Sequence, residues 1–257
     1  MKFATWNVNS LKVRLPQVLD WLAEHSDITA LCLQETKMDD PVFPQAEIEA
    51  AGFHVVFAGQ KTYNGVAIIS RAPIEDVIIN IPGFDDPQKR AIAATINGVR
   101  LVDVYIPNGQ SLDSEKFPYK MAWLAALKDF VASELKQHPK LALLGDYNIA
   151  PEDRDVHDIK KWIDGILVSP TERGFFNEFI ELGLVDSFRL FEQAEKSFSW
   201  WDYRGFSFKK NAGLRIDHIL LSAELAQLCT ACEIDVEPRK NERPSDHTPV
   251  IATFVEN

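Results

Sequence analysis

The sequence has only three cysteines in 257 residues, and it has no long hydrophobic run. A sparse, odd set of cysteines excludes a disulfide-stapled scaffold and fits a reducing compartment, so we expect a cytoplasmic protein. Because no uninterrupted apolar run approaches the roughly 20 residues that span a bilayer, we expect no membrane segment. Met1 and Lys2 lead directly into a predicted strand without an apolar leader, so we also expect no export signal.

The cysteines do not indicate a metal or redox site either. Cys229 and Cys232 form a CxxC pair, but the sequence has no second CxxC and no HxxxH pair to complete a zinc site. A redox CxxC would open a helix in a βαβ context, which the surrounding pattern does not provide. We interpret both residues as small apolar side chains of a structural segment.

The chain lacks basic character. With 27 Lys and Arg against 38 Asp and Glu, its formal net charge is −11, which by itself argues against a nucleic-acid partner because phosphate attraction is electrostatic. Acidic side chains gathered around a divalent cation would lower this total, however, while a separate basic rim could still contact phosphates. The net charge therefore leaves both possibilities open.

The composition predicts one large α/β domain over residues 1–257. Apolar residues make up 46% of the chain and charged residues 25%, and no linker, repeat or low-complexity stretch divides it. Short β-branched segments between turn signals predict strands, many of them close enough for hairpins, in a mostly antiparallel or mixed sheet system. These predicted strands are residues 3–8, 28–33, 54–58, 66–70, 91–96, 100–106, 141–144, 216–221 and 249–254.

Three helices are predicted between these strands. Apolar residues recur every three or four positions over residues 115–136, which predicts a long helix packed on a sheet. Ser169 to Glu172 is a capping-box sequence with Pro170 at the first helical position, and Gly183 ends the pattern. A shorter helix follows Leu15. The apolar face of the long helix is expected to contain Phe117, Met121, Leu124, Leu127, Val131 and Leu135, and that of the short one Val18, Leu19 and Leu22.

Polar side chains follow several of the predicted strands. Asp146 and Asn148 come directly after the buried-looking segment 141–144, and period-two alternation turns both the same way. Glu35 follows segment 28–33, and residues 3–6 of the first strand lead into Asn7 and Asn9. Asp and Asn also favour turns, so any one of these positions could be purely structural. Their recurrence at strand ends favours a shared oxygen-rich site.

Asp217 is the acidic residue that fits a structural role least well. It lies in an otherwise apolar strand, where an unpaired buried carboxylate would be costly. A histidine such as His247, after Ser245-Asp246, is a natural partner, because its ring can donate to the carboxylate and hold the other nitrogen toward a substrate. Carboxylates and carboxamides with few thiols suit Mg²⁺ or Mn²⁺ rather than zinc, and such ions point to phosphate chemistry.

The motifs that carry these residues resemble the exonuclease III and apurinic/apyrimidinic endonuclease family of DNA repair, in order and over essentially the whole chain. The motifs are WNVNSL (6–11), LQETK (33–37), NGVA (64–67), YIPNG (105–109), GDYNIAP (145–151), GLRID (213–217) and PSDH (244–247). The resemblance implies a DNase I-like α/β fold, a four-layer sandwich of two mixed β-sheets packed face to face with helices outside. It also implies a Mg²⁺- or Mn²⁺-dependent phosphodiesterase with one or two ions, acting as a monomer on double-stranded DNA.

The resemblance assigns roles to the matching residues. It implies metal ligands at Asn7, Glu35, Asp146, Asn148, Asp246 and His247, and catalytic roles for Tyr105, Asp146, Asn148, Asp217 and His247. Asp146 would activate or align water, with Asn148 orienting it. His247, paired with Asp217, would contact the scissile phosphate. Tyr105 would serve the phosphate or the leaving oxygen, although it could also simply end a strand in water, and His247 could cap the last strand.

A basic rim and an apolar pocket would complete such a site. DNA contacts are expected from Lys61, Tyr63, Asn64, Arg90, Asn108, Lys116, Arg204, Lys209 and Lys210, all of which could instead be solvated loop residues. The family's pocket for a baseless sugar matches Trp200, Leu214 and Ile216. Some relatives have a second Trp at the position of Leu214, so the balance between abasic-site incision and 3′-end trimming stays open.

Two other functions share parts of this pattern. A phosphodiesterase for inositol phosphates or sphingolipids could use the same metal centre. The loop at residues 203–211, in which aromatic and cationic side chains are interleaved, favours DNA as the substrate instead. A DNA-end binding module without turnover is disfavoured because no matched catalytic position is substituted. The sequence therefore predicts an enzyme of the exodeoxyribonuclease III type.

Overall fold

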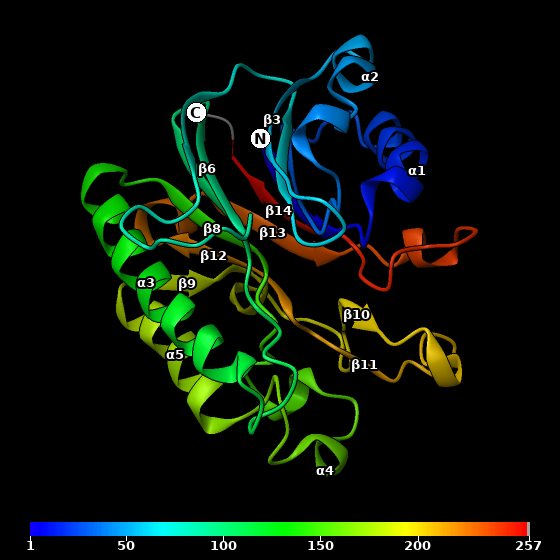
Figure 1. The fold of residues 1–257 in the computed structure, drawn as a ribbon, viewed down its shortest axis with the longest axis vertical. Helices are drawn as coiled ribbons and strands as arrows, with labels where there is room; N and C mark the ends of the chain where they lie inside the picture. Colours follow the sequence, from blue (N-terminus) through cyan, green and yellow to red (C-terminus); the bar gives the residue numbers. More distant parts are fainter. Residues whose placement is uncertain (256–257) are drawn as a thin grey trace.

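The chain folds into two six-stranded sheets that pack face to face, with helices on both outer faces (Figure 1). The computed structural model describes residues 1–255. In the first sheet the strand order is β13 (Cys229–Ile234), β14 (Val250–Phe254), β1 (Lys2–Asn7), β2 (Ala30–Gln34), β4 (Val66–Ser70) and β3 (His54–Ala58). In the second it is β5 (Glu75–Ile79), β6 (Ala91–Ile96), β7 (Val99–Tyr105), β8 (Leu141–Asp146), β12 (Asp217–Ser222) and β9 (Leu184–Asp186). The predicted four-layer sandwich is confirmed.

Both sheets are mixed, as predicted. Strands β1 and β2 run parallel in the first sheet and β7 and β8 run parallel in the second, whereas the other pairings are antiparallel. A separate two-stranded ribbon joins β10 (Trp200–Trp201) to β11 (Gly213–Leu214). The carboxyl ends of the four central parallel strands carry the polar residues singled out in the sequence, so the topology decides where a site can form.

The helices form the two outer layers. Helices α1 (Leu11–Glu24) and α2 (Gln45–Ala50) pack on the first sheet, and α3 (Lys116–Gln137) and α5 (Pro170–Glu181) pack on the second (Figure 1). The shorter elements are α4 (Ile159–Trp162), α6 (Ala223–Ala226), η1 (Asp40–Val42), η2 (Asp153–Asp155), η3 (Ser187–Leu190), η4 (Arg204–Phe206) and η5 (Glu237–Lys240). None of the helices within residues 1–255 has the length and apolarity to cross a membrane.

Helix α3 differs from its predicted amphipathic face. Leu124, Leu127 and Val131 are buried as predicted, but Phe117, Met121 and Leu135 are only partly buried. The buried face also includes two charged residues, Lys120 and Glu134, each held in an ion pair. Periodicity assigns charged side chains to the solvent side, so it could not identify these two.

The prediction missed the edge strands β5 and β13, as well as the short strands β9, β10 and β11. Strand β5 is mostly exposed, and β13 interrupts its apolar residues with polar ones and contains a register shift. Cys229 and Cys232 lie in β13 as free thiols, and burial raises the pKa of the Cys232 thiol to about 12. These positions agree with a structural role for both cysteines.

A buried acid lies between the sheets and should limit stability at alkaline pH. Gln34 Nε2 donates to Oδ1 of Asp103 at 2.6 Å, but Asp103 Oδ2 has no hydrogen-bond partner within residues 1–255. Burial raises the pKa of this carboxyl well above its usual range. In the unfolded chain the same group ionises above about pH 4. Folding therefore takes up a proton, and this residue's contribution to stability falls as pH rises.

We expect Asp103→Asn to raise the melting temperature at pH 8 by a few degrees, because asparagine keeps the shape without the ionisation cost. The gain should shrink toward pH 4, as the carboxyl becomes protonated in the unfolded chain as well. Calorimetry of both proteins at pH 8 and near pH 4 measures the difference. An equal shift at the two pH values would contradict this account.

Candidate active site

Strand register places three predicted catalytic residues side by side on the second sheet. Tyr105, the last residue of β7, lies opposite Asp146 at the end of β8, and Asp146 lies opposite Asp217 at the start of β12. On the first sheet, Asn7 at the end of β1 lies opposite Gln34 at the end of β2, with Glu35 next in the chain. The facing sheets thus bring oxygen-bearing side chains together at one edge.

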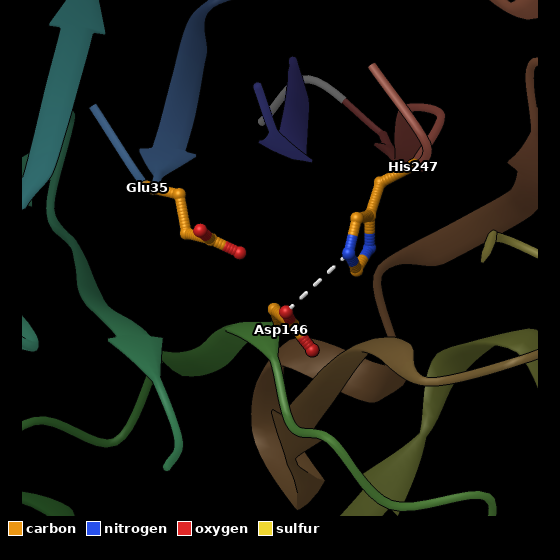
Figure 2. Close-up of side chains that lie close together, drawn as sticks. All are labelled: Glu35, Asp146 and His247. Carbon is orange, nitrogen blue, oxygen red and sulfur yellow. Dashed lines mark ion pairs between the residues drawn. The ribbon is translucent and has the colours of Figure 1, made fainter. Parts of the chain in front are cut away.

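Glu35, Asp146 and His247 converge on a common space. Figure 2 shows the three side chains pointing toward one another from three different segments, and one ligand atom of each lies within 4.8 Å of the others. The two carboxylates are hard oxygen donors that a divalent cation can use. The amide of Asn7 bridges the two acids, donating to Glu35 Oε1 at 2.9 Å and to Asp146 Oδ2 at 2.9 Å.

His247 forms the predicted pair with Asp217. Its Nδ1 lies 2.9 Å from Asp217 Oδ2, so Nδ1 carries the proton that it donates to this carboxylate, and Nε2 faces Asp146 Oδ2 at 3.6 Å. Burial alone would disfavour the imidazolium, but the charges of Asp217 and Asp146 outweigh it and raise the pKa of His247 to about 10. At neutral pH this histidine is a cation that can contact an anionic oxygen.

Asp146 is buried and held by its neighbours. The backbone N–H of Asn148 donates to Asp146 Oδ1 at 2.9 Å, and Asn148 adopts a positive φ of 48° that allows this local bond. Burial raises the pKa of Asp146 to about 7; the charge of His247 lowers it and that of Asp217 raises it. A carboxylate with such a pKa accepts a proton far more readily than an ordinary aspartate.

Tyr105 lies beside the same space with an un-ionised hydroxyl. Burial, followed by the charges of Glu35 and Asp146, raises the pKa of Tyr105 well above its usual value, so the phenol can donate a hydrogen bond at neutral pH. The Arg90 guanidinium carbon lies 4.7 Å from the centre of the Tyr105 ring, and Arg90 Nη1 donates to the Tyr105 carbonyl at 3.1 Å. Arg90 was predicted to contact DNA, but here it is largely buried and supports Tyr105.

Asp246 lies in contact with a different set of residues. Its carboxylate accepts hydrogen bonds from Asn9 Nδ2 and Trp200 Nε1, both at 3.0 Å. Lys37 connects this group to the acids, because its Nζ lies 2.6 Å from Asn9 Oδ1 and 3.0 Å from Glu35 Oε2. Sequence reasoning gave Lys37 no role, although it lies in the same LQETK motif as Glu35.

The predicted DNA contacts fall into two regions. One is a cavity of about 660 Å³ beside Tyr105, and the other is the exposed loop around η4, whose Phe206 side chain is 76% exposed. Tyr63, Asn64, Arg90, Asn108 and Lys116 line the cavity, whereas Arg204, Lys209 and Lys210 belong to the loop and Lys61 is exposed near Tyr63. Asn108 also donates to Asn148 Oδ1 at 3.1 Å, which ties it to the catalytic side.

The three residues matched to the sugar pocket are not equally accessible. Leu214 and Ile216 are fully buried in an apolar cluster with Leu167 and Val168, and Trp200 is partly exposed at its edge. The loop before α5 contributes Leu167 and Val168 to the same cluster.

Comparison with known proteins identifies the relatives of this arrangement. The chain is 36% identical to exodeoxyribonuclease III of Haemophilus influenzae, covering 99% of this chain and 100% of that protein. Its structure is similar to the 3′ phosphatase NExo from Neisseria bound to product DNA hairpin (TM-score 0.98, 50% identity, 100% of both chains). It is also similar to an AP endonuclease from Archaeoglobus fulgidus (TM-score 0.95, 38% identity, 99% of both chains).

These likenesses confirm the resemblance that the sequence motifs indicated. The sequence matches the Endonuclease/Exonuclease/phosphatase family over residues 4–247, a range that contains every one of the predicted site residues. With that match and the full-length relatives, this chain belongs to the endonuclease/exonuclease/phosphatase family, in its exonuclease III and AP endonuclease branch.

Proposed function

We propose that this chain is a Mg²⁺- or Mn²⁺-dependent DNA repair phosphodiesterase that trims 3′ ends of duplex DNA and cleaves 5′ to abasic sites. The observation that supports it most is the convergence of Glu35, Asp146 and His247 beside the His247–Asp217 pair. The relatives named for exodeoxyribonuclease, 3′ phosphatase and AP endonuclease activities support the same reaction class. In each case water would attack a DNA phosphorus and displace a 3′ oxygen, leaving a 3′-hydroxyl end.

The residues have separable roles in this proposal. Asp146 would accept a proton from the attacking water, since its raised pKa makes it an effective base. His247, protonated at neutral pH, would donate from Nε2 to a non-bridging phosphate oxygen, with Asp217 holding the ring. Tyr105 would donate to the scissile phosphate or to the leaving oxygen, and Asn148 would orient the water with Asp146.

The cation site in this proposal is the space between the two acids. Glu35 and Asp146 would hold one or two Mg²⁺ or Mn²⁺ ions, with Asn7, Asn148, Asp246 and His247 close by. When bound, a divalent cation would supply positive charge that neutralises the phosphate oxygens. The carboxylate and carboxamide oxygens fit such a hard ion, which also explains why an acidic protein can act on DNA.

Substrate recognition in this proposal uses the two regions beside the acids. The cavity lined by Tyr63, Asn64 and Lys116 would receive one stretch of the backbone, and the η4 loop with Arg204 and Phe206 would contact the groove. Trp200 would face the sugar. We further propose that residues 1–257 form one catalytic domain that acts as a cytoplasmic monomer, which light scattering in solution would test.

The function is tested with three substrates: duplex DNA with an abasic analogue, with a 3′-phosphate, and with an ordinary 3′-hydroxyl end. We expect cleavage of these DNAs in Mg²⁺ or Mn²⁺, no product in EDTA, and recovery when the metal is restored. Undiminished activity in EDTA would rule out the metal mechanism. Tight DNA binding without product over hours would favour a binding module, and turnover of inositol phosphates instead of DNA would favour the alternative phosphodiesterase.

A further inference from the structure

A buried ammonium group connects the loops that follow β7 and β8. Lys120 of helix α3 is 0% exposed, and its Nζ donates to the carbonyl of Asn108 at 3.2 Å and to the carbonyl of Asn148 at 2.8 Å. It also forms an ion pair with Glu172, which is 0% exposed on helix α5. The ammonium therefore has backbone oxygens from two site loops and a carboxylate from a third segment as partners.

Glu172 extends this network to the loop of Leu167, which belongs to the apolar cluster of Leu214 and Ile216. Its Oε1 accepts the backbone N–H of Leu167 at 3.0 Å, and its Oε2 accepts the Ser169 hydroxyl at 2.6 Å and the Ser169 N–H at 3.2 Å. Leu167 has a φ of 74°, a left-handed conformation that is unfavourable for leucine unless its surroundings hold it. The Leu167 carbonyl accepts the N–H of Ala150 at 2.8 Å. The loop of Leu167 is thus bonded to the segment that carries Asn148.

Stability alone does not explain a buried pair of this kind. Replacing a buried ion pair with apolar residues of similar volume is often neutral or stabilising, because both charges lose their hydration on folding. An apolar pair could not donate to the carbonyls of Asn108 and Asn148 or accept from Leu167. The pair provides directed bonds that fix three loops relative to one another. Asn148 in turn donates its backbone N–H to the carboxylate of Asp146.

We propose that Lys120, together with Glu172, is a positioning residue for phosphodiester hydrolysis: it fixes Asn148, and through it Asp146, while holding the loop of Leu167 in the apolar cluster of Leu214 and Ile216. This inference rests on the proposed function, since it assigns Asn148 and Asp146 to the reaction. Neither Lys120 nor Glu172 contacts substrate in it. Small displacements of a catalytic group are enough to cost a large part of the rate, so the effect should appear in kcat.

The test uses the double variant Lys120→Met/Glu172→Met, which keeps the side-chain volume and removes every directed bond of the pair. On a duplex with a 3′-phosphate at saturating Mg²⁺, we expect kcat to fall by about tenfold to a hundredfold with KM changed less than about threefold. Amide hydrogen exchange at Leu167 and Ala150 should accelerate by about tenfold or more, because both N–H groups depend on the fixed loop. A purely structural pair would leave kcat per folded molecule unchanged.

Two other ion pairs, each with one residue on α3, provide matched controls. Lys128 and Glu178 join α3 to α5 at 2.6 Å, with side chains 33% and 41% exposed, away from the site loops. Arg100 and Glu134 form a buried pair at the other end of α3, at 2.5 Å. Replacing either pair with methionines is expected to leave kcat and exchange at Leu167 as in the wild type, whatever happens to the melting temperature.

The outcomes separate the two proposals. If the Lys120 and Glu172 variant keeps wild-type kcat, or if the Arg100 and Glu134 variant loses as much kcat, the positioning role is wrong. If the wild type does not cleave DNA, the proposed function fails, and exchange at Leu167 still decides whether the pair fixes the loop. If the double variant does not fold, Glu172→Gln takes its place; we expect kcat to fall about threefold to tenfold at constant KM, and wild-type kcat would overturn the proposal.

Discussion

Asp146→Asn is expected to lower kcat by about 10²- to 10⁴-fold, the range lost when a general base is removed. Asparagine keeps the shape of the side chain and can still accept the Asn148 N–H at Oδ1, so the local backbone should stay in place. It cannot take a proton from water at neutral pH. Because a negative charge is removed next to the phosphate site, DNA affinity should be unchanged or higher. Single-turnover cleavage and fluorescence-anisotropy binding measure the two quantities.

The pH dependence and a control make this prediction specific. Activity needs Asp146 ionised, so the rate should rise with pH through the pKa of Asp146, which is about 7 without a cation. A divalent cation favours the ionised form of Asp146. The midpoint of the acidic limb of the pH–rate profile should therefore move to lower pH as the Mg²⁺ concentration is increased. Asp113→Asn, at an exposed loop position, should leave the rate and its pH dependence unchanged. Retention of more than about a tenth of the wild-type kcat in Asp146→Asn would show that another group is the base.

The sequence predicted the composition of this site better than its geometry. Alternation within single segments placed polar residues at strand ends, which is a local property that a sequence can carry. Tyr105, Asp146 and Asp217 lie side by side only because of which strands are neighbours and in what register they pair. Strands β8 and β12, which carry two of them, are separated by about 70 residues of sequence. Pattern and propensity do not specify such long-range pairing. The family resemblance supplied it instead.

The residues that were missed or reassigned share a physical cause. Lys120 and Glu172 are charged, so helix periodicity alone assigns them to solvent; only the fold shows that each neutralises the other in the interior. Arg90 was predicted to contact DNA; it lines the cavity beside Tyr105 and is largely buried against the Tyr105 ring. In each case the role of the charge is set by tertiary partners far away in the sequence. Lys209 and Lys210 are exposed, have no such partner in the part of the chain that the structure describes, and stay predicted DNA contacts.

His247→Ala is the second change expected to have a large effect, with kcat lowered by about 10²- to 10³-fold or more. Alanine removes a cation that is fixed by Asp217 and directed at the space beside Asp146. The change also leaves the buried carboxylates of Asp146 and Asp217 without the positive charge that they share. This loss should raise the pKa of Asp146 further and move the acidic limb of the pH–rate profile to higher pH. His138→Ala, at a partly exposed position at the end of α3, is the matched histidine control and should leave kcat and its pH dependence unchanged.

Asp217→Asn distinguishes the charge of His247 from its position. Asparagine Oδ1 can still accept the Nδ1 proton, so the ring should keep its orientation, but the carboxylate that most raises the pKa of His247 is gone. In the wild type the histidine stays protonated until about pH 10, and the rate should fall only above that pH. In Asp217→Asn the alkaline limb of the pH–rate profile should move toward the ordinary pKa range of histidine. The variant should then approach wild-type activity near pH 6 and lose most of its activity by pH 9. If the limb stayed near pH 10, the imidazolium would not be the group that contacts the phosphate, and His247 would act through its hydrogen-bond geometry alone.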